Sequence, residues 1–375
     1  MATTTITASV LVGPKQLVLQ TREIAPPQPN EVQVKMKATT LCGSDLHYYT
    51  HFRNGDFIVR EPLSLGHEAA GIIVAVGNEV SDFAIGDRVA IEVGISCLLC
   101  EFCLQGRYNL CSRMQFRSSA KSFPHFQGTL QDRINHPAML CHKLPASISY
   151  SQAALIEPLS VAIHAGRRAR VEPGMRVLVL GAGAVGLFCA AIAKVSGAST
   201  VVVGDIAAAR VDFAVANGFA TGGYTVPVPA TTASTIDEKL ADARTTADAM
   251  LALDDGAAGH FDVVFECTGV ESCVQSGIYA AKSGGKVMLV GMGSPVQSLH
   301  LSAAAVREVD LLGVFRYANV YATAIRLLVE KRIPVFDRLV THEFSGLESV
   351  DDAFKVAGRT VDDEGRLVLK TVITY

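Results

Sequence analysis

Side chains able to hold a metal ion gather at two places in the first half of the chain. At the first, the segments "LCGSDLH" and "LGHEAAG" supply Cys42 and the adjacent pair His67 and Glu68. One sulfur, one nitrogen and one oxygen donor, with a fourth position left open, are typical of catalytic zinc. The alternative is a structural cysteine and a core histidine beside an unpaired glutamate, which is expensive to bury. The residues therefore favour a catalytic metal site.

The second group consists of four cysteines within the stretch "CLLCEFCLQGRYNLC": Cys97, Cys100, Cys103 and Cys111. Their C-x2-C-x2-C-x7-C spacing is typical of a closed four-thiolate site, in which zinc is structural. The chain has nine cysteines, an odd number, which fits a reducing compartment better than a disulfide framework. We predict a structural zinc site here, and a loop of unligated thiols is the alternative.

A glycine-rich turn in the second half of the chain has the pattern of a dinucleotide site. Gly181, Gly183 and Gly186 follow the apolar run "RVLVL" and open a helical stretch. A second apolar run ends at Asp205, 19 residues after Gly186, where an acceptor for a ribose 2′-hydroxyl is expected. The glycines let the backbone approach a pyrophosphate, and a carboxylate at Asp205 repels the 2′-phosphate of NADP. The pattern favours NAD, with NADP or plain helix packing as the alternatives.

Two kinds of secondary structure surround these groups. Up to about residue 150, alternating or glycine-bounded runs such as 31–40 predict short β-strands. From residue 153, apolar runs alternate with helical patterns, which predicts a buried parallel sheet built from βαβ units. Residues 221–260 read as a loop and an alanine-rich helix that form a surface excursion from this second region.

Composition narrows the possible functions. The 375 residues are 49% hydrophobic and 18% charged, with a formal net charge of -3, which predicts a globular protein of two domains. No basic run suggests nucleic acid, and no apolar run approaches the roughly 20 residues of a membrane helix. The N-terminal stretch lacks the pattern of a signal peptide. We expect a cytoplasmic protein that has neither nucleic acid nor a membrane as a partner.

Taken together, the motifs resemble those of the zinc-dependent medium-chain dehydrogenase/reductase superfamily, and most of all its polyol dehydrogenase group (sorbitol, xylitol and L-arabinitol dehydrogenases). In the expected order they are "CGSDLHYY", "GHEAAG", "GDRVAIE", "GRYNLC", "IEPLSVAIHA", "GAGAVG", "ECTG" and "GVFRY". The resemblance implies a GroES-like β-rich catalytic domain over 1–152, completed by 335–375. It implies a Rossmann domain with a doubly wound parallel sheet over 153–334, in a fold of class α/β plus β.

The implied reaction is NAD-dependent oxidation of a secondary hydroxyl of a small-molecule polyol (sorbitol, xylitol or L-arabinitol) to the ketose. The resemblance implies one catalytic and one structural zinc per subunit, and a homo-oligomer, either a dimer or a tetramer. The catalytic ion is held by residues matching Cys42, His67 and Glu68, and Glu157 binds it directly or holds its water. Another zinc-dependent alcohol or threonine dehydrogenase, a zinc-free quinone reductase and a non-enzymatic protein are the alternatives.

Three residues after Cys42 acquire roles from the same resemblance. Ser44 receives the substrate proton, and His47 passes it towards solvent. Asp45 is expected to orient His67 through the second ring nitrogen. The plainer interpretations are a turn hydroxyl for Ser44, a surface histidine for His47 and a helix N-cap for Asp45.

The resemblance also assigns a substrate pocket and a cofactor surface. The substrate-binding residues are Tyr48, Phe116, Glu157, Arg316 and Tyr317. The cofactor-binding residues are Gly181, Gly183, Val185, Gly186, Asp205, Arg210, Val290, Gly291, Met292, Val314, Phe315 and Arg316. A guanidinium at Arg316 can donate to several hydroxyls of a polyol, although an ion pair at a domain edge is the alternative. Phe116 could equally be core. The alternative for residues 290–292, 314 and 315 is ordinary sheet core, and for Arg210 it is a solvated helix residue.

Overall fold

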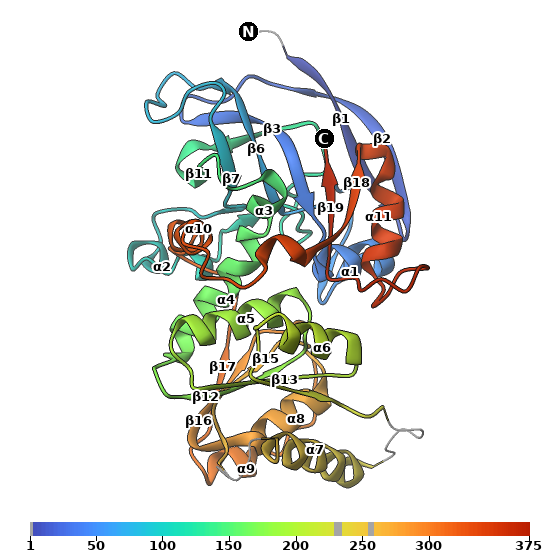
Figure 1. The fold of residues 1–375 in the computed structure, drawn as a ribbon. Coiled ribbons are helices and arrows are strands. Elements are labelled where there is room, and N and C mark those ends of the chain that lie inside the picture. Colours follow the sequence, from blue (N-terminus) through green and yellow to red (C-terminus); the bar gives the residue numbers. More distant parts are fainter. Residues whose placement is uncertain (1–2, 229–234, 254–258) are drawn as a thin grey trace. The chain divides into compact units, whose positions relative to one another are not determined.

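The computed structural model describes residues 3–228, 235–253 and 259–375, and its contacts divide the chain into two compact units (Figure 1). Unit 1 contains the residues up to Pro158 together with Ala318–Glu330 and Phe336–Tyr375. Unit 2 contains Leu159–Tyr317 and Lys331–Val335. We describe each unit by itself.

Unit 1 is built around a sheet of seven strands in the order β11-β7-β6-β3-β19-β18, with β10 also paired to β3. Their bounds are β3 Glu31–Thr40, β6 Glu68–Val76, β7 Arg88–Ile91, β10 Arg133–Pro137, β11 Cys141–Lys143, β18 Val340–Ser345 and β19 Lys370–Thr374. The strands expected in the N-terminal region are confirmed. The C-terminal strand β19 pairs antiparallel with β3 and parallel with β18, so the end of the chain completes this sheet.

Shorter elements surround the sheet of unit 1. They are β1 Thr4–Gly13, β2 Gln16–Ile24, α1 Gly43–His51, β4 Arg53–Asn54, β5 Phe57–Ile58, β8 Gly94–Ile95, α2 Glu101–Leu104, β9 Gln115–Phe116, α3 Tyr150–Ala154, α10 Tyr321–Val329 and α11 Val350–Ala357. Single 3-10 turns span Tyr108–Leu110, Ala138–Leu140, Phe336–Leu339 and Leu347–Ser349. Helix α4, Ile156–Ala169, contains the boundary after Pro158.

Unit 2 is a six-stranded parallel sheet in the order β14-β13-β12-β15-β16-β17. The strands are β12 Arg176–Leu180, β13 Thr200–Asp205, β14 Gly222–Thr225, β15 Phe261–Glu266, β16 Ala281–Leu289 and β17 Asp310–Gly313. The helices are α5 Ala184–Val195, α6 Ala208–Ala216, α7 Ile236–Leu251, α8 Glu271–Ala280 and α9 Leu301–Ala305. Within unit 2, Figure 1 shows α5 and α6 on one face of the sheet and α7 and α8 on the other.

The order of these six strands follows the doubly wound dinucleotide-binding arrangement. Numbered from β12, it reads 3-2-1-4-5-6, and the crevice of such a sheet lies where the order reverses, between β12 and β15. Helices cover both faces, so the central strands must be apolar throughout, and Val177–Leu180 are indeed buried. The predicted fold class, α/β plus β, is confirmed.

The described parts of the segment 221–260 belong to the sheet and core of unit 2, which corrects their interpretation as a surface excursion. Strand β14 is the edge strand of the unit 2 sheet, paired with β13, and α7 contributes Ala243, Ala247 and Met250 to the core. The strand was missed because its sequence, "GGYT", has no apolar run. Residues 229–234 and 254–258 of this segment lie outside the described residues.

Residues 318–330 also differ in placement, because the sequence boundaries put them in the cofactor domain. In the structure they contact unit 1: Tyr321 Oη donates to the Ile91 carbonyl at 2.9 Å, and the Asn319 amide donates to Tyr108 Oη at 2.7 Å. The sequence gives no sign of this, since an apolar helix suits either unit.

Glycine at position 186 is required by close backbone approach. A Cβ added to Gly186 would lie 1.8 Å from the Gly181 carbonyl oxygen, whereas one added to Gly222 would lie 3.9 Å from its nearest neighbour. We therefore expect Gly186→Ala to lower the free energy of unfolding by about 1–3 kcal/mol, as for other overpacked sites. Gly222→Ala is the control and should change little. Equal stabilities of the two variants in denaturant titrations would contradict this explanation.

Candidate metal and dinucleotide sites

Strand pairing in unit 1 brings the three predicted metal ligands together. Thr40 near the end of β3 pairs with Glu68 at the start of β6, and Cys42 follows as the N-cap of α1. One ligand atom from each of Cys42, His67 and Glu68 lies within 4.8 Å of the other two. His67 and Glu68 are buried, so their polar atoms need partners.

Asp45 fixes one side of this group. Its Oδ1 lies 3.1 Å from His67 Nδ1 and accepts from Ser118 Oγ at 2.6 Å and from the Gly66 amide at 3.2 Å. Its Oδ2 accepts from the Cys42 amide at 3.2 Å. Asp45 therefore orients His67, as expected, and is also a helix-capping residue. Burial raises the pKa of Asp45, but His67 and the hydrogen-bond donors together lower it below its ordinary value.

A buried lysine contacts the Glu68 side of this group of three candidate ligands. Lys370, the first residue of β19, is 5% exposed, and its Nζ lies 2.5 Å from both Glu68 carboxylate oxygens. The same ammonium donates to the Leu41 carbonyl at 3.0 Å, and Thr40 Oγ1 donates to Glu68. Burial lowers the pKa of Lys370, but Glu68 and Cys42, with Glu157, raise it above its ordinary value. A permanent cation thus faces the carboxylate that sequence reasoning assigned to the metal.

The donor set fits zinc in kind. Thiolate, imidazole and carboxylate are zinc's usual ligands, and three of them leave a position for substrate or water. Burial lowers the pKa of His67, yet Asp45 and Cys42 raise it well above its ordinary value. Asp45 and Cys42 favour a proton on the His67 ring, and the same negative charges would favour a metal cation bound to that ring instead of the proton.

The other residues predicted near the metal lie at different distances from this group. Ser44 is half-buried and His47 exposed, three residues apart on α1 and hence on one helix face. Glu157 is buried in α4 and close enough to Lys370 to raise its pKa, but it lies outside the group of three ligands. Phe116 on β9 packs its ring 5.5 Å from that of His67. The structure therefore brings Phe116 to the metal group.

The positions of three predicted substrate residues, Tyr48, Arg316 and Tyr317, do not by themselves support a role in substrate binding. Tyr48 is buried in the core of unit 1, where its Oη accepts from the Ala120 amide at 3.1 Å. In unit 2, Tyr317 is buried, and the Arg316 guanidinium lies 4.7 Å from the centroid of the Phe315 ring. Arg316 has φ 52°, a left-handed conformation that is uncommon for a residue with a side chain.

The four cysteines of the second group converge as their spacing predicts. Their sulfur atoms all lie within 4.8 Å of one another, with Cys100 and Cys103 3.4 Å apart. All nine cysteines are free thiols. The Leu99 amide is the main cause that lowers the pKa of Cys97 to about 6, which favours the thiolate form that binds metals. The four cysteines pack against the core cluster of unit 1 that also contains Phe116.

The glycine turn of unit 2 is tied to the acidic residue predicted for ribose. Gly181 has φ 96°, and Gly183 is the N-cap of α5, so free amides of the first turn of that helix are available to an anion. Asp205, the last residue of β13, accepts from the Ala182 amide through Oδ2 at 2.7 Å and from the Ala207 amide through Oδ1 at 2.8 Å. The carboxylate is thereby held beside the turn.

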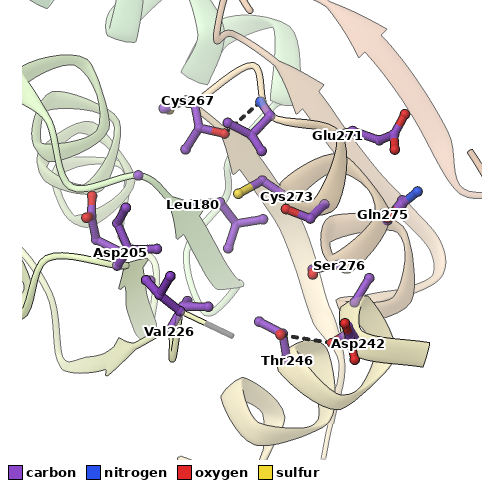
Figure 2. A pocket seen from close by; sticks show the side chains of 18 of the residues that line it. Leu180, Asp205, Val226, Asp242, Thr246, Cys267, Glu271, Cys273, Gln275 and Ser276 are labelled. Carbon is purple, nitrogen blue, oxygen red and sulfur yellow. Dashed lines mark hydrogen bonds between the residues drawn. The ribbon is translucent and has the colours of Figure 1, made fainter. Parts of the chain in front are cut away.

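A cavity of about 730 Å³ opens beside this turn (Figure 2). Its lining includes Gly181, Gly183, Asp205 and Arg210, so four predicted cofactor residues share one cavity. Residues that sequence reasoning missed line it too: Val226, Pro227, Thr246, Cys273 and Gln275. They follow β14 or lie on α7 and α8, elements whose approach to the turn only the tertiary fold determines. The size is that of a cofactor pocket.

The remaining cofactor predictions lie outside that cavity's lining. Val185 and Gly186 belong to α5, and Gly186 packs on Gly181. The amides of Val290 and Gly291 both donate to the Glu266 carbonyl at 2.9 Å, and that of Val314 to Leu289. Met292, which follows them, is exposed.

Comparison with known proteins agrees with this architecture. Residues 28–146 match the alcohol dehydrogenase GroES-like domain, and residues 184–330 match the zinc-binding dehydrogenase domain. Sorbitol dehydrogenase of Gallus gallus is 42% identical over 92% of this chain and 90% of its own length. The chain belongs to the zinc-binding dehydrogenases, in their polyol dehydrogenase group. A polyol dehydrogenase of this family is an oxidoreductase, and the candidate sites above are therefore those of an enzyme.

Two solved structures show the same fold for this polyol dehydrogenase. An oxidoreductase of unknown specificity from Escherichia coli is 31% identical with a TM-score of 0.83, and the alignment covers 99% of both chains. A zinc-binding dehydrogenase from Sinorhizobium meliloti, bound to NADP, is 25% identical with a TM-score of 0.81 over 99% of this chain and 100% of that one. Within the described residues, no helix has the length and apolar character to cross a membrane.

The buried pair of Lys370 and Glu68 gives a prediction about stability. Removing one partner leaves the other charge buried and uncompensated, so Lys370→Ala should lower the free energy of unfolding by about 3–5 kcal/mol. Lys355→Ala is the control, because Lys355 contacts Asp351 and Asp352 on the exposed face of α11 and should matter little. Chemical denaturation of both variants measures the difference. Similar losses in the two would show that Glu68 does not depend on Lys370.

Proposed function

We propose that this protein is an NAD-dependent zinc polyol dehydrogenase that oxidises a secondary hydroxyl of a sugar alcohol to the ketose. The observation that carries the proposal is the convergence of the half-buried Cys42 with the buried His67 and Glu68 in a chain 42% identical to a sorbitol dehydrogenase. Unit 2 supplies a dinucleotide fold with an acidic residue at the ribose position. Metal ligands and cofactor fold together distinguish this function from that of a zinc-free reductase.

The residues around the metal group fit this chemistry. Zinc held by Cys42, His67 and Glu68 would supply Lewis acidity that lowers the pKa of a substrate hydroxyl. Asp45 would hold the His67 ring in place, and Lys370 would hold the Glu68 carboxylate. Glu157, outside the three ligands, would bind the metal directly or through its water.

A route for the substrate proton is supported by α1. We assign its acceptance to Ser44 and its onward transfer to His47, on the same helix face. Although the His47 side chain is exposed, partial desolvation of its ring and the neighbouring His51, whose ring centroid lies 6.0 Å away, lower the pKa of His47 below its ordinary value. A histidine with a lowered pKa is neutral at neutral pH and able to accept a proton.

NAD, rather than NADP, is the cofactor that we propose. The Asp205 carboxylate lies beside the glycine turn, and a 2′-phosphate there would meet a like charge. Arg210 lines the same cavity and is assigned to the adenine side. We assign the nicotinamide side to residues 290–292 and 314–316, which follow strand ends.

The substrate pocket is assigned to Tyr48, Phe116, Glu157, Arg316 and Tyr317. Phe116 is supported by its contact with His67, and Arg316 by the ability of a guanidinium to donate to several hydroxyls. Sorbitol, xylitol and L-arabinitol are the candidate substrates. Another alcohol or threonine dehydrogenase activity is the second candidate, because the metal and cofactor groups alone do not select a polyol.

The four-cysteine group is proposed to hold a second, structural zinc, since its four convergent sulfurs leave no open position. A cytoplasmic location is supported by nine free thiols. We also propose a homo-oligomer, either a dimer or a tetramer. The edge strand β17, with half-buried Leu311 and Leu312, is one surface where copies could pair.

A substrate panel tests the proposed reaction. Zinc-replete protein with NAD should produce NADH from at least one of sorbitol, xylitol or L-arabinitol faster than from ethanol or threonine. Cys42→Ala should reduce kcat/KM at least about 100-fold while NAD binding, measured by calorimetry, stays intact, because Cys42 belongs to unit 1. Faster turnover of ethanol or threonine would transfer the assignment to the second candidate. Unchanged turnover in Cys42→Ala would refute a metal role for this group.

The cofactor assignment gives a separate prediction. Asp205→Ala removes the repelling carboxylate, so the ratio of kcat/KM for NADP to that for NAD should rise at least about tenfold. Asp212→Ala, on α6 and outside the cavity lining, is the control and should leave the ratio unchanged. If wild-type protein already prefers NADP, the choice of NAD is wrong.

A further inference from the structure

A second, smaller cavity in unit 1 is lined by an unusual number of arginines. It has a volume of about 190 Å³ and lies between the β1–β2 hairpin and β10. Arg22 comes from β2, Arg117 from the residue after β9, and Arg133 from the start of β10. None of these residues has a part in the metal group or the dinucleotide site.

Arg117 is the buried member of this arginine pocket. It is 5% exposed, and its guanidinium donates to the carbonyls of Gln127 and Asn135 and to His136 Nδ1. All of these partners are uncharged acceptors: burial, with Arg117 beside it, lowers the pKa of His136 well below its ordinary value, so His136 is neutral. Burial lowers the pKa of Arg117 to about 10, although Cys141 and Glu31 act to raise it. Among the described residues no carboxylate bonds to Arg117, so its charge is buried at a cost.

Arg22 and Arg133 are bound only by amide oxygens. Arg22 donates to Gln127 Oε1 at 3.0 Å and to Gln20 Oε1 at 3.2 Å, and Arg133 donates to Gln33 Oε1 at 3.2 Å. Each guanidinium has five N–H donors, so both retain donors beyond these contacts. In the described part of the chain, no carboxylate forms an ion pair with any of the three arginines.

Two acidic residues close to the pocket, Glu23 and Asp132, form no ion pair with its arginines. Glu23 also lines the pocket, but it lies opposite Thr5 and accepts from its hydroxyl at 2.7 Å, while Arg22 lies opposite Ile6. Successive residues of a strand point to opposite faces, so Glu23 faces away from Arg22. Asp132 accepts from the Thr7 amide at 2.7 Å.

Strand pairing adds a further positive charge. Lys35 of β3 lies directly opposite Arg133 in the β10–β3 ladder. Like charges at opposed positions are destabilising, and the ladder therefore carries a repulsion that an anion would relieve. Lys35 is exposed and can turn its ammonium towards a ligand.

We propose that this arginine pocket is a binding site for a phosphate group, either free or carried by a small phosphorylated metabolite. Guanidinium forks donate paired, charge-assisted hydrogen bonds to phosphate oxygens, and Arg22 and Arg133 retain the donors to do so. Arg117 is the buried residue in the lining of the pocket and supplies positive charge there. The inference is independent of the proposed dehydrogenase reaction, because it uses no residue of that site.

The test measures the melting temperature of the full-length protein against phosphate concentration, at constant ionic strength and saturating NAD. NAD occupies the turn at Gly183, which is the other expected phosphate site. We expect a saturable rise in Tm of about 1–3 °C in the wild type. Arg22→Gln/Arg133→Gln should lose this rise, whereas Arg53→Gln/Lys355→Gln, which removes two exposed charges elsewhere in unit 1, should keep it.

A parallel titration with glycerol 3-phosphate identifies the source of the phosphate group. Tighter binding than that of inorganic phosphate would indicate a phosphorylated metabolite, and weaker binding would indicate the free ion. Hydrogen exchange of the wild type provides a second measurement if the double variant does not fold: phosphate should protect peptides from β2 and β10. A phosphate response that is equal in both double variants, or that rises linearly without saturation and protects neither strand, would overturn the proposal.

Discussion

The candidate metal group of unit 1, formed by Cys42, His67 and Glu68, depends on one buried ion pair, between Lys370 and Glu68. The ammonium contacts a carboxylate on β6 and a carbonyl that follows β3, and it comes from β19. Three strands are therefore joined at the point where the metal ligands emerge. In a dry interior such a pair stabilises only when its remaining hydrogen bonds are satisfied, and here Thr40 and Leu41 satisfy them. The carboxylate is shared between a lysine and the position proposed for a metal, so its charge is balanced from both sides.

The two units build their sites by opposite means. Unit 1 relies on charged side chains held by one another, with Asp45 on one side of His67 and Lys370 on one side of Glu68. Unit 2 relies on missing side chains, because Gly186 approaches the Gly181 carbonyl more closely than any Cβ permits. The first arrangement is sensitive to charge and the second to volume. A substitution that removes a charge should therefore damage the site of unit 1, whereas one that adds a methyl group should damage the site of unit 2.

Sequence reasoning reached the parts of the site that are local in the chain. The spacing of four cysteines within fifteen residues and of three glycines within six predicted two sites. The structure brings the four cysteines together and places Gly181 and Gly183 in the lining of one cavity. Lys370 was missed because it lies 302 residues from Glu68, although a lysine inside the apolar run "LVLKTVITY" is itself a signal of a buried partner. Strand β14 was missed because glycines replace its apolar residues, and its membership of the sheet is set by pairing with β13. A sequence pattern predicts sites whose residues are close together in the chain, whereas contacts between residues far apart in the chain follow only from the tertiary fold.

The position of β19 also governs when the enzyme can form during synthesis. Unit 2 is almost contiguous, from Leu159 to Tyr317, so its sheet can assemble once that stretch has left the ribosome. Unit 1 starts earlier in the chain but obtains the partner of Glu68 only from β19, Lys370–Thr374. Until that strand has been made, Glu68 has no Lys370, and β3 lacks its β19 neighbour over Ala38–Thr40. Unit 1 therefore begins before unit 2 and is completed after it, so the candidate metal group of Cys42, His67 and Glu68 acquires its lysine only once unit 2 has been synthesised.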